Sequence, residues 1–385
     1  MAARELRTKE DRRNVGETVD YPFLILILLL LGVGLAMLYS ASSAQSMYDT
    51  GYEISTKYLQ KQAVCALLGL IAMYFFSRIP ADVWYRLAWP IYGVSILLLL
   101  SVLVIGQEVN GAKRWVSIGG IQFQPSEVAK FAMILVFARL TREYGPDAKK
   151  FRFGVFGFGV TLLGILVSLA LEKHLSAIML MGMVAVVMMF VAGTSPKWLL
   201  AGAGAAALFV LVYITFMGYA GDRVTAWLDP NSDPGDTGYQ ILQSLYAIGS
   251  GGLFGMGFGR SRQKYLYLPF QYNDYIFAIV CEELGLIGAG FIVILFLVTI
   301  LRGYWIALKA STRFSTVLAA GLTTLIAVQT ILNLCVVTNL LPSTGIALPF
   351  FSYGGTALAV NLGEMGVILN ISRERNRVKK QEVFS

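Results

Sequence analysis

Long apolar runs recur along almost the whole chain, and they restrict its possible folds more than any other feature. A helix needs about 20 predominantly apolar residues to cross the hydrocarbon core of a bilayer. Only 14% of the residues are charged, compared with about 25% in soluble domains. We therefore expect an all-α polytopic membrane protein with about ten transmembrane helices, at roughly 22–43, 60–77, 83–105, 126–141, 153–171, 175–193, 198–217, 275–301, 314–337 and 356–371.

Two boundaries in this pattern are weak. The span at 126–141 is the least apolar because it contains Glu127 and Lys130. The spans at 153–171 and 175–193 are separated only by Glu172-Lys173-His174, for which a simple polar turn is the favoured interpretation.

Basic residues gather beside alternate spans, and this pattern predicts the orientation. An even number of spans places both termini on one side, and a cytoplasmic side accommodates most of the basic residues. We expect a charged cytoplasmic tail (1–20) without a cleavage site, a transmembrane domain (21–372) and a basic cytoplasmic tail (373–385). The long loop 218–274, between the seventh and eighth spans, is then extracytoplasmic. The net charge of +8 indicates topology and anionic-lipid contact rather than nucleic-acid binding.

The cysteine and histidine content argues against a metal held by protein ligands. Cys65, Cys281 and Cys335 lie in or beside apolar runs, so we expect neither a disulfide framework nor a thiolate site. His174 is the single histidine.

Three extracytoplasmic segments, 106–125, 218–273 and 338–356, are rich in polar residues, glycine or proline. Broken backbone at membrane depth survives only where it is buried in protein or lines a wet cavity. We therefore expect the functional site among these segments. No internal repeat is visible, which disfavours an inverted-repeat transporter.

Gly251–Gly285 is the most informative stretch. Asp274 stands where it changes from polar loop to apolar helix, so this carboxylate is a candidate functional group, although it could simply cap the helix. The glycines before it lack the lysine of a P-loop, and a close-packed or flexible loop is favoured over a phosphate cradle. Arg260, Arg262 and Lys264, spaced by two, would share one side of an extended strand and could face an anion, or could form a solvated basic loop.

Other charged pairs also have two readings. Glu127 and Lys130, three residues apart, can form a structural ion pair within one helix or belong to a site. Lys113 and Arg114, next to Trp115, can anchor the chain at the interface or hold a phosphate-bearing lipid head group. Of Glu282 and Glu283, at least one must face protein or water.

Three blocks resemble the SEDS family of cell-wall polymerases (FtsW, RodA and SpoVE), and more closely the FtsW/SpoVE branch. They read NGAKRWVSIGGIQFQPSEVAKFAMIL, GMGFGRSRQKYLYLPFQYNDYIFAIVCEELG and LLPSTGIALPFFSYGGTAL. In two places the sequence departs from the family pattern. The usual Pro-Glu-x-His-Thr-Asp reads Pro269-Phe270-Gln271-Tyr272-Asn273-Asp274, so a proton relay through that histidine cannot operate. The usual Pro-Asp-Leu-Gly reads Lys173-His174-Leu175-Ser176.

The resemblance implies a peptidoglycan glycosyltransferase that polymerises lipid II at the outer face of the bacterial cytoplasmic membrane. It also implies a class B penicillin-binding protein as transpeptidase partner, together with other division or elongation proteins. Asp274 matches the family's essential aspartate, Glu127 and Lys130 its intramembrane pair, and Lys113 and Arg114 its basic pair.

In this reading Asp274 is the general base that activates a sugar hydroxyl. The departing pyrophosphate would be held by a divalent cation (Mg²⁺ or Mn²⁺) or by substrate-binding residues from the set Lys113, Arg114, Glu127, Lys130, Arg260, Arg262 and Lys264. Two alternatives remain open. A scaffold of the division machinery would have no catalytic group. A lipid II flippase would use ionisable residues in several spans, for which the candidates are Glu127, Lys130, Glu172, Glu282 and Glu364.

Overall fold

The computed structural model describes residues 19–109, 112–118, 121–202, 204, 218–232 and 237–384. Its helices are α2 (Tyr21–Asp49), α3 (Lys57–Phe76), α4 (Ala81–Ile105), α5 (Pro125–Tyr144), α6 (Phe158–Leu171), α7 (Leu175–Ala192), α9 (Gly218–Leu228), α10 (Thr237–Gly251), α11 (Ile276–Leu308), α12 (Arg313–Val337) and α13 (Gly355–Phe384). Short helical turns are η1 (Gly145–Lys149), η2 (Arg152–Gly157) and η3 (Pro230–Ser232), and the strands are β1 (Gln107–Val109), β2 (Ala112–Ile118) and β3 (Ile121–Phe123).

The predicted spans coincide with helices, except that the span at 198–217 lies mostly outside the described residues. In the described part, seven helices are long and apolar enough to cross a membrane: α2, α3, α4, η2 with α6, α7, α11 and α12. Helices α5 and α13 are not among them. α5 contains the buried Glu127 and Lys130, and α13 ends in a strongly charged stretch.

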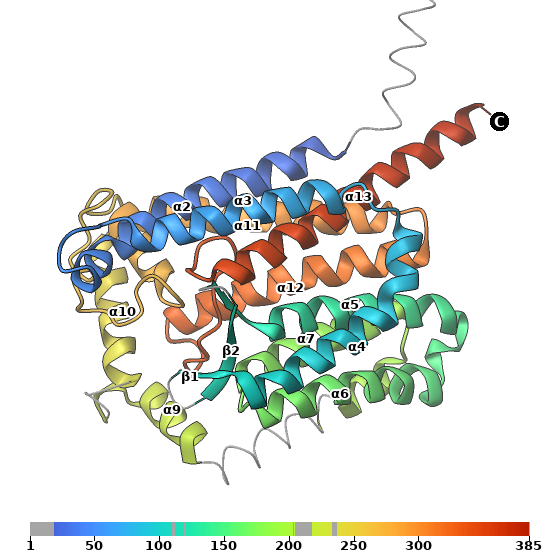
Figure 1. The fold of residues 1–385 in the computed structure, drawn as a ribbon, viewed down its shortest axis with the longest axis horizontal. Coiled ribbons are helices and arrows are strands. Elements are labelled where there is room, and N and C mark those ends of the chain that lie inside the picture. Colours follow the sequence, from blue (N-terminus) through green and yellow to red (C-terminus); the bar gives the residue numbers. More distant parts are fainter. Residues whose placement is uncertain are drawn as a thin grey trace, which may run out of the picture.

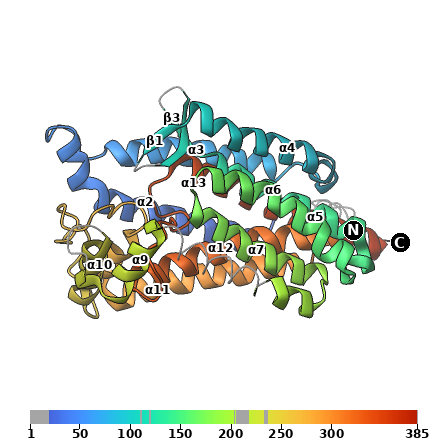
Figure 2. The same ribbon diagram turned by 90° about the horizontal axis from the view of Figure 1, so that it is seen from below.

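The long helices lie side by side in a bundle (Figure 1). One end of the bundle carries α9, α10 and the three strands, and we call it the loop-rich end; the C-terminal end of α13 projects from the opposite end (Figures 1 and 2). α11 packs against α12 and α2, and α13 packs mainly against α3. Helices α5 and α12 are buried along almost their whole length, so the core lies around them.

The expectation of an all-α fold is wrong in one place. Strands β1, β2 and β3 form a small antiparallel sheet, with Glu108 opposite Lys113 and Ser117 opposite Gln122. The sequence carries a signal for it, since Asn110-Gly111 and Gly119-Gly120 separate consecutive strands, and such dipeptides favour two-residue hairpins.

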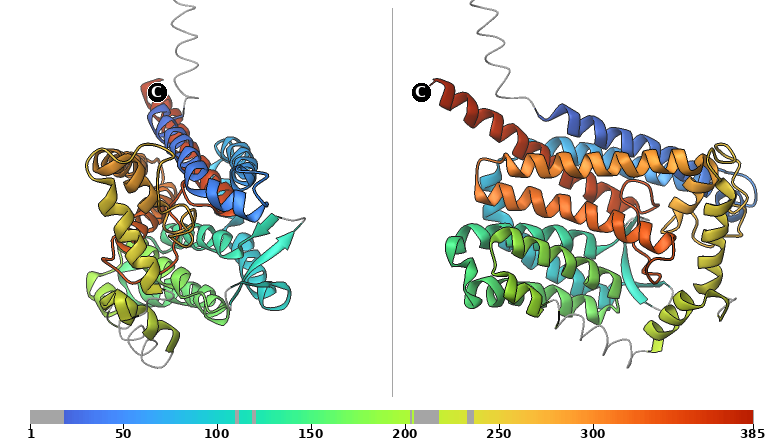
Figure 3. Two further views of the ribbon diagram at one scale, coloured as in Figure 1. Left: turned by 90° about the vertical axis from the view of Figure 1, so that its left-hand side faces the viewer. Right: turned by 180° about the vertical axis from the view of Figure 1, so that it is seen from behind.

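The long loop and the C-terminal tail are also more regular than expected. The loop 218–274 contains the helices α9 and α10, which stand at the loop-rich end in Figure 3. The predicted boundary between the last span and a tail starting at residue 373 does not interrupt α13, which continues to Phe384. Of the N-terminal tail, residues 1–18 lie outside the described part.

The glycine-rich stretch that starts at Gly251 forms backbone hydrogen bonds at a break in α11. Gly285 has non-helical backbone angles with φ of 65°, which frees backbone groups on either side of it. The N–H groups of Leu286 and Ile287 donate to the carbonyl oxygens of Gly252 and Leu253 at 2.9 and 3.1 Å. A Cβ on Gly285 would lie 2.3 Å from the backbone nitrogen of Gly255, so neither glycine tolerates a side chain. The close-packed alternative is therefore confirmed for Gly251 and Gly255, whereas a Cβ on Gly252 or Gly259 would meet open space.

Candidate functional site

Asp274 lies immediately before α11 at the loop-rich end, and its side chain is partly buried. The N-cap position of α11 is Tyr275 and no side chain caps the helix there, so the capping alternative for Asp274 is wrong. The backbone is fixed instead by Asn333, whose Nδ2 donates to the carbonyl oxygens of Asp274 and Ile346 at 2.7 and 2.8 Å. The carboxylate faces Gly345, where a Cβ would lie 3.7 Å from Oδ2 of Asp274.

The electrostatic setting of Asp274 favours its protonated form more than water does. Burial raises the pKa of the Asp274 carboxyl to about 6, although its own backbone N–H and the positive charge of Arg223 oppose the shift. Arg223 on α9 is held beside the site by Ser343, whose carbonyl oxygen accepts from Nη1 at 2.9 Å. A carboxyl with a pKa near neutrality can act as a general base.

The turn between α6 and α7 contacts the segment that faces Asp274. The hydroxyl of Ser176 donates to the carbonyl oxygen of Thr344, next to the Gly345 that faces Asp274. Arg114 on β2 reaches this turn, since its Nη2 donates to the carbonyl oxygen of Lys173 at 2.5 Å. Lys113, its neighbour, is exposed, so the structure separates the two residues of the basic pair.

Glu127 and Lys130 form the ion pair that their spacing predicted. Nζ of Lys130 lies 2.7 Å from Oε2 of Glu127, and both side chains are buried within α5. Glu364 on α13 and His174 both interact electrostatically with Lys130. The pair is therefore part of a larger polar cluster and not an isolated structural ion pair.

Several buried polar atoms in these elements and in other segments have no hydrogen-bond partner among the residues that the structure describes. They come from α5, the α6–α7 turn, α12, the segment before α13, and α13 itself: Ser126 Oγ, Glu172 Oε1, His174 Nδ1, Asn333 Oδ1, Thr344 Oγ1, Thr356 Oγ1, Asn361 Oδ1 and both carboxylate oxygens of Glu364. Such orphaned atoms are rare in native proteins and indicate space for water or a polar ligand. We call Glu127, Lys130, Glu172, His174 and Glu364, which interact electrostatically with one another or with Arg114, the polar cluster.

The carboxylates of Glu282 and Glu283 hold the basic loop instead of facing a ligand. Glu283 accepts from the backbone N–H groups of Gly259 and Ser261 at 3.0 and 3.2 Å and from the hydroxyl of Ser40 at 2.6 Å. Glu282 accepts from the backbone N–H of Arg262 at 3.0 Å and from the hydroxyl of Ser261. Both glutamates are buried and face protein, as expected for at least one of them.

Lys264 also takes part in the contacts between Glu283 and this loop. Its Nζ lies 3.2 Å from Oε1 of Glu283 and donates to the carbonyl oxygen of Gly259 at 2.6 Å. Lys264 is 3% exposed, whereas Arg260 and Arg262 are exposed. The expectation that these three residues share one side of an extended strand is wrong, because the loop folds into turns around the two glutamates.

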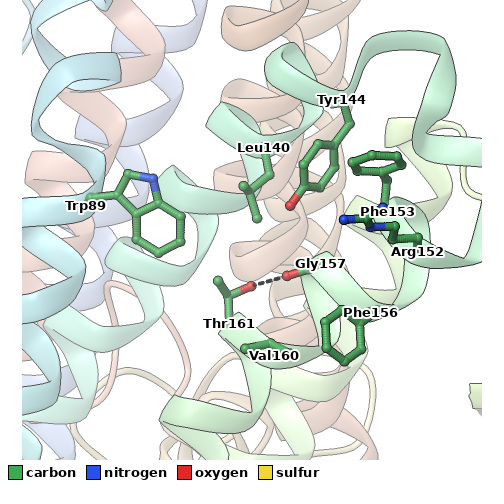
Figure 4. A pocket seen from close by; sticks show the side chains of 9 residues that line it. All are labelled: Trp89, Leu140, Tyr144, Arg152, Phe153, Phe156, Gly157, Val160 and Thr161. Carbon is green, nitrogen blue, oxygen red and sulfur yellow. Dashed lines mark hydrogen bonds between the residues drawn. The ribbon is translucent and has the colours of Figure 1, made fainter.

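A separate pocket of about 300 Å³ is lined by residues of α4, α5, η2 and α6 (Figure 4). Its lining is mostly apolar, with Trp89, Phe156 and Val160, and Arg152 and Tyr144 are its only ionisable side chains. It lies outside the polar cluster, and nothing in its lining corresponds to the carboxyl chemistry around Asp274.

In the described ranges no three His, Cys, Asp or Glu side chains gather closely enough to hold a metal ion. The three cysteines are free thiols.

The sequence alone does not indicate Arg223 or His174 as site residues, and it indicates Glu364 only as an ionisable residue that a flippase would use. Arg223 lies in a loop whose fold could not be foreseen. The sequence favours a simple turn at His174. The signal for a larger role is that His174 stands where the family usually has the aspartate of Pro-Asp-Leu-Gly. Glu364 is a carboxylate in an otherwise apolar span, which is itself a signal for function.

The comparisons with known proteins agree with one another. Residues 21–377 match the model of the FtsW/RodA/SpoVE family, described as cell cycle protein. The chain is 40% identical over 366 residues to the probable peptidoglycan glycosyltransferase FtsW of Geobacter sulfurreducens, covering 93% of this chain and 97% of the relative. It is 39% identical over 366 residues to stage V sporulation protein E of Bacillus subtilis, covering 92% and 97%.

Solved structures give the same result. A structure described as "Structural coordination of polymerization and crosslinking by a peptidoglycan synthase complex" superposes with a TM-score of 0.79 at 28% identity, covering 93% of this chain and 98% of the other. The rod shape determining protein RodA of Thermus thermophilus superposes with a TM-score of 0.70 at 26% identity, with the same coverage.

The helices and the polar cluster at one end of the bundle thus define a multi-span membrane protein with an ionisable site next to the polar loops. The chain belongs to the FtsW/RodA/SpoVE family, as the resemblance of the three blocks implied.

Proposed function

We propose that this protein is a peptidoglycan glycosyltransferase that polymerises lipid II into glycan strands at the outer face of the bacterial cytoplasmic membrane. The observation that carries the proposal is Asp274, a partly buried carboxyl with a pKa of about 6 that faces Gly345 and interacts electrostatically with Arg223. The Geobacter sulfurreducens relative, a probable peptidoglycan glycosyltransferase, supports the same activity.

In the proposed reaction the 4-hydroxyl of one lipid-linked disaccharide attacks the anomeric carbon of the lipid-linked sugar of another. The carbon–oxygen bond to undecaprenyl diphosphate breaks, and Asp274 accepts the hydroxyl proton. A sugar hydroxyl is a poor nucleophile, so a positioned carboxylate lowers the barrier. A single inverting displacement needs one base, unlike the two-carboxylate arrangement of glycoside hydrolases.

Cations of the site would stabilise the negative charge of the departing diphosphate. Arg114, Lys130 and Arg223 are the candidates that the geometry favours, since each interacts with the polar cluster or with Asp274. Glu127 would hold Lys130 in place. Arg260, Arg262 and Lys113 are exposed. They would contact the substrate before it reaches Asp274. Lys264 is buried and paired with Glu283, so its charge is already balanced within the protein.

A divalent cation, Mg²⁺ or Mn²⁺, would enter the site bound to the diphosphate of the substrate, which would supply its ligands. The described residues hold no three-ligand set of their own.

The proposed orientation places both termini in the cytoplasm, with ten spans and the loop-rich end outside. The basic residues near the opposite end, such as Arg139, Arg142 and Lys150, support it through the positive-inside rule. We keep 21–372 as the transmembrane domain, with an extracytoplasmic loop 218–274 between the seventh and eighth spans.

A class B penicillin-binding protein is the proposed partner, together with other division or elongation proteins. The structure with the highest TM-score quoted above concerns a complex that coordinates polymerization and crosslinking. The loop after α10 exposes Leu253, Phe254 and Phe258 at the loop-rich end, and such apolar side chains suit contact with a membrane-anchored protein.

Purified protein incubated with lipid II, with and without the transpeptidase, tests the function. Glycan polymer on a gel supports the glycosyltransferase. Lipid II that becomes accessible to a dye across liposome bilayers, without polymer, would instead indicate a flippase. Neither product would indicate a scaffold.

A further inference from the structure

The turn between α6 and α7 is built so that two ionisable side chains point inward. Lys173 has a left-handed backbone with φ of 55°, a conformation that costs a non-glycine residue about 1 kcal/mol. The N–H of His174 donates to the carbonyl oxygen of Leu169 at 2.9 Å, as in a helix-ending Schellman turn. Lys173 is exposed, whereas Glu172 and His174 on either side of it are buried.

Each of these side chains is at least nine-tenths buried and carries an orphaned atom. Glu172 is 3% exposed and His174 is 9% exposed. Within the described residues, Oε1 of Glu172 and Nδ1 of His174 have no hydrogen-bond partner. Leaving such atoms unpaired is costly, so they are suited to meet groups that arrive from outside the chain.

The surroundings keep both groups uncharged at neutral pH. Burial raises the pKa of Glu172 to about 8 although Arg114 opposes the shift, and burial lowers the pKa of His174 to about 3, helped by Arg114 and Lys130. A carboxylic acid and a neutral imidazole both donate or accept hydrogen bonds without charge. They suit hydroxyl and amide groups rather than a phosphate.

The turn also lies between the proposed cations and the proposed base. Arg114 binds the carbonyl oxygen of Lys173 at 2.5 Å. Ser176 binds the carbonyl oxygen of Thr344, adjacent to the Gly345 that faces Asp274. A ligand that spans this region would contact cations, neutral hydrogen-bonding groups and the carboxylate.

We propose that Glu172 and His174 form a subsite that positions an N-acetylhexosamine ring of the lipid-linked substrate, with its diphosphate toward Arg114 and Lys130. The subsite rests on the proposed function and deepens it. Glu172 and His174 act as positioning residues through the hydroxyl and acetamide groups of the sugar, and they take no part in the proton transfer at Asp274.

Binding of lipid II to protein in nanodiscs tests the subsite in the background of Asp274→Asn, which prevents turnover. Glu172→Leu and His174→Leu should each raise the Kd about tenfold, because the sugar loses a buried hydrogen bond. Glu172→Gln, which keeps a neutral hydrogen-bonding group, should stay within about threefold of the parent. Ser168→Ala, one helical turn earlier with a hydroxyl bonded within its own helix, is the matched control and should leave the Kd unchanged.

In the otherwise wild-type protein, the two leucine variants should raise KM for lipid II and keep kcat within about threefold. An unchanged Kd in both leucine variants, with the thermal unfolding temperature preserved, would overturn the subsite. A fall in kcat at constant Kd would also overturn it, because the residues would then act in the chemical step. Wild-type protein that fails to polymerise lipid II would refute the proposed function, a result separate from either of these.

Discussion

A few residues of this protein combine burial with charge in a way that stability alone does not explain. Asp274, Glu172, His174 and Glu364 are all partly or fully buried, and the last three carry orphaned atoms among the described residues. Such groups cost folding free energy. Their common location beside the loop-rich end indicates that they serve a ligand.

The pKa of Asp274 predicts the pH dependence of the reaction. A general base acts when it is ionised, so kcat/KM should be constant above pH 7 and fall about tenfold per pH unit below a midpoint near 6. Initial rates of lipid II polymerisation between pH 5 and 8 measure this profile. A rate that stays constant down to pH 5 would contradict the assignment.

The same shift predicts a stability change. Because the folded pKa lies above the unfolded value near 3.9, ionisation of Asp274 destabilises the fold above pH 6, and this penalty vanishes below pH 4. Asp274→Asn should therefore raise the thermal unfolding temperature in detergent by about 1–4 °C at pH 8 and leave it unchanged at pH 4. A lower unfolding temperature at pH 8 would show that the carboxylate is stabilising.

Arg114 and Lys113 are adjacent in β2 but should differ in effect. Arg114 reaches the α6–α7 turn, whereas Lys113 is exposed. Arg114→Ala should reduce turnover at least tenfold, and Lys113→Ala should reduce it less than about threefold. Equal losses in the two variants, compared at saturating lipid II, would mean that the sheet presents both residues to the substrate.

Among the elements, the kinked α11 and the loop before it determine where Asp274 lies. The break at Gly285 admits the backbone of Gly252 and Leu253, and Glu282 and Glu283 bind the next turns of the loop. Both the backbone of α11 and two of its side chains thus form hydrogen bonds with the loop. Asp274 directly precedes the helix that carries these attachments.

The ion pair of Glu283 with Lys264 should be a strong part of this attachment. Glu283→Gln leaves the buried ammonium of Lys264 without its counter-charge and should cost about 3–5 kcal/mol of stability. Thermal unfolding and trypsin cleavage after the exposed Arg260 and Arg262 report on it. Glu283→Gln with Lys264→Met should recover part of the loss.

The exposed pair of Lys150 with Asp147 provides the control. Both side chains are more than half exposed, so Asp147→Asn should cost less than about 1 kcal/mol. A Glu283→Gln variant as stable as this control would mean that the loop is held by its backbone bonds alone.

For the molecule as a whole, the apolar runs predicted the helices well because period and length act locally. The tertiary arrangement around Asp274 could not be predicted in the same way. The sequence pattern presents Lys264 as a candidate phosphate ligand, whereas in the fold it pairs with Glu283, 19 residues later. Arg223 and Glu172 approach the site from separate elements, and no local pattern indicates that they meet.

The orientation of the whole molecule is a further prediction. In a cysteine-free background, Leu266→Cys in the loop-rich end should react with a membrane-impermeant maleimide in intact cells, because it lies outside. Ala310→Cys, between α11 and α12 at the opposite end, should react only after the membrane is permeabilised. Labelling of the second variant in intact cells would reverse the proposed topology.

The most direct test of the account compares wild type, Asp274→Asn and the exposed-loop control Asp229→Asn for polymerisation of purified lipid II. We predict polymer from the wild type and the control, and none from Asp274→Asn, with its Kd for lipid II within about threefold of wild type. Glycan strands formed by Asp274→Asn at the wild-type rate would contradict the central claim that this carboxylate is the base.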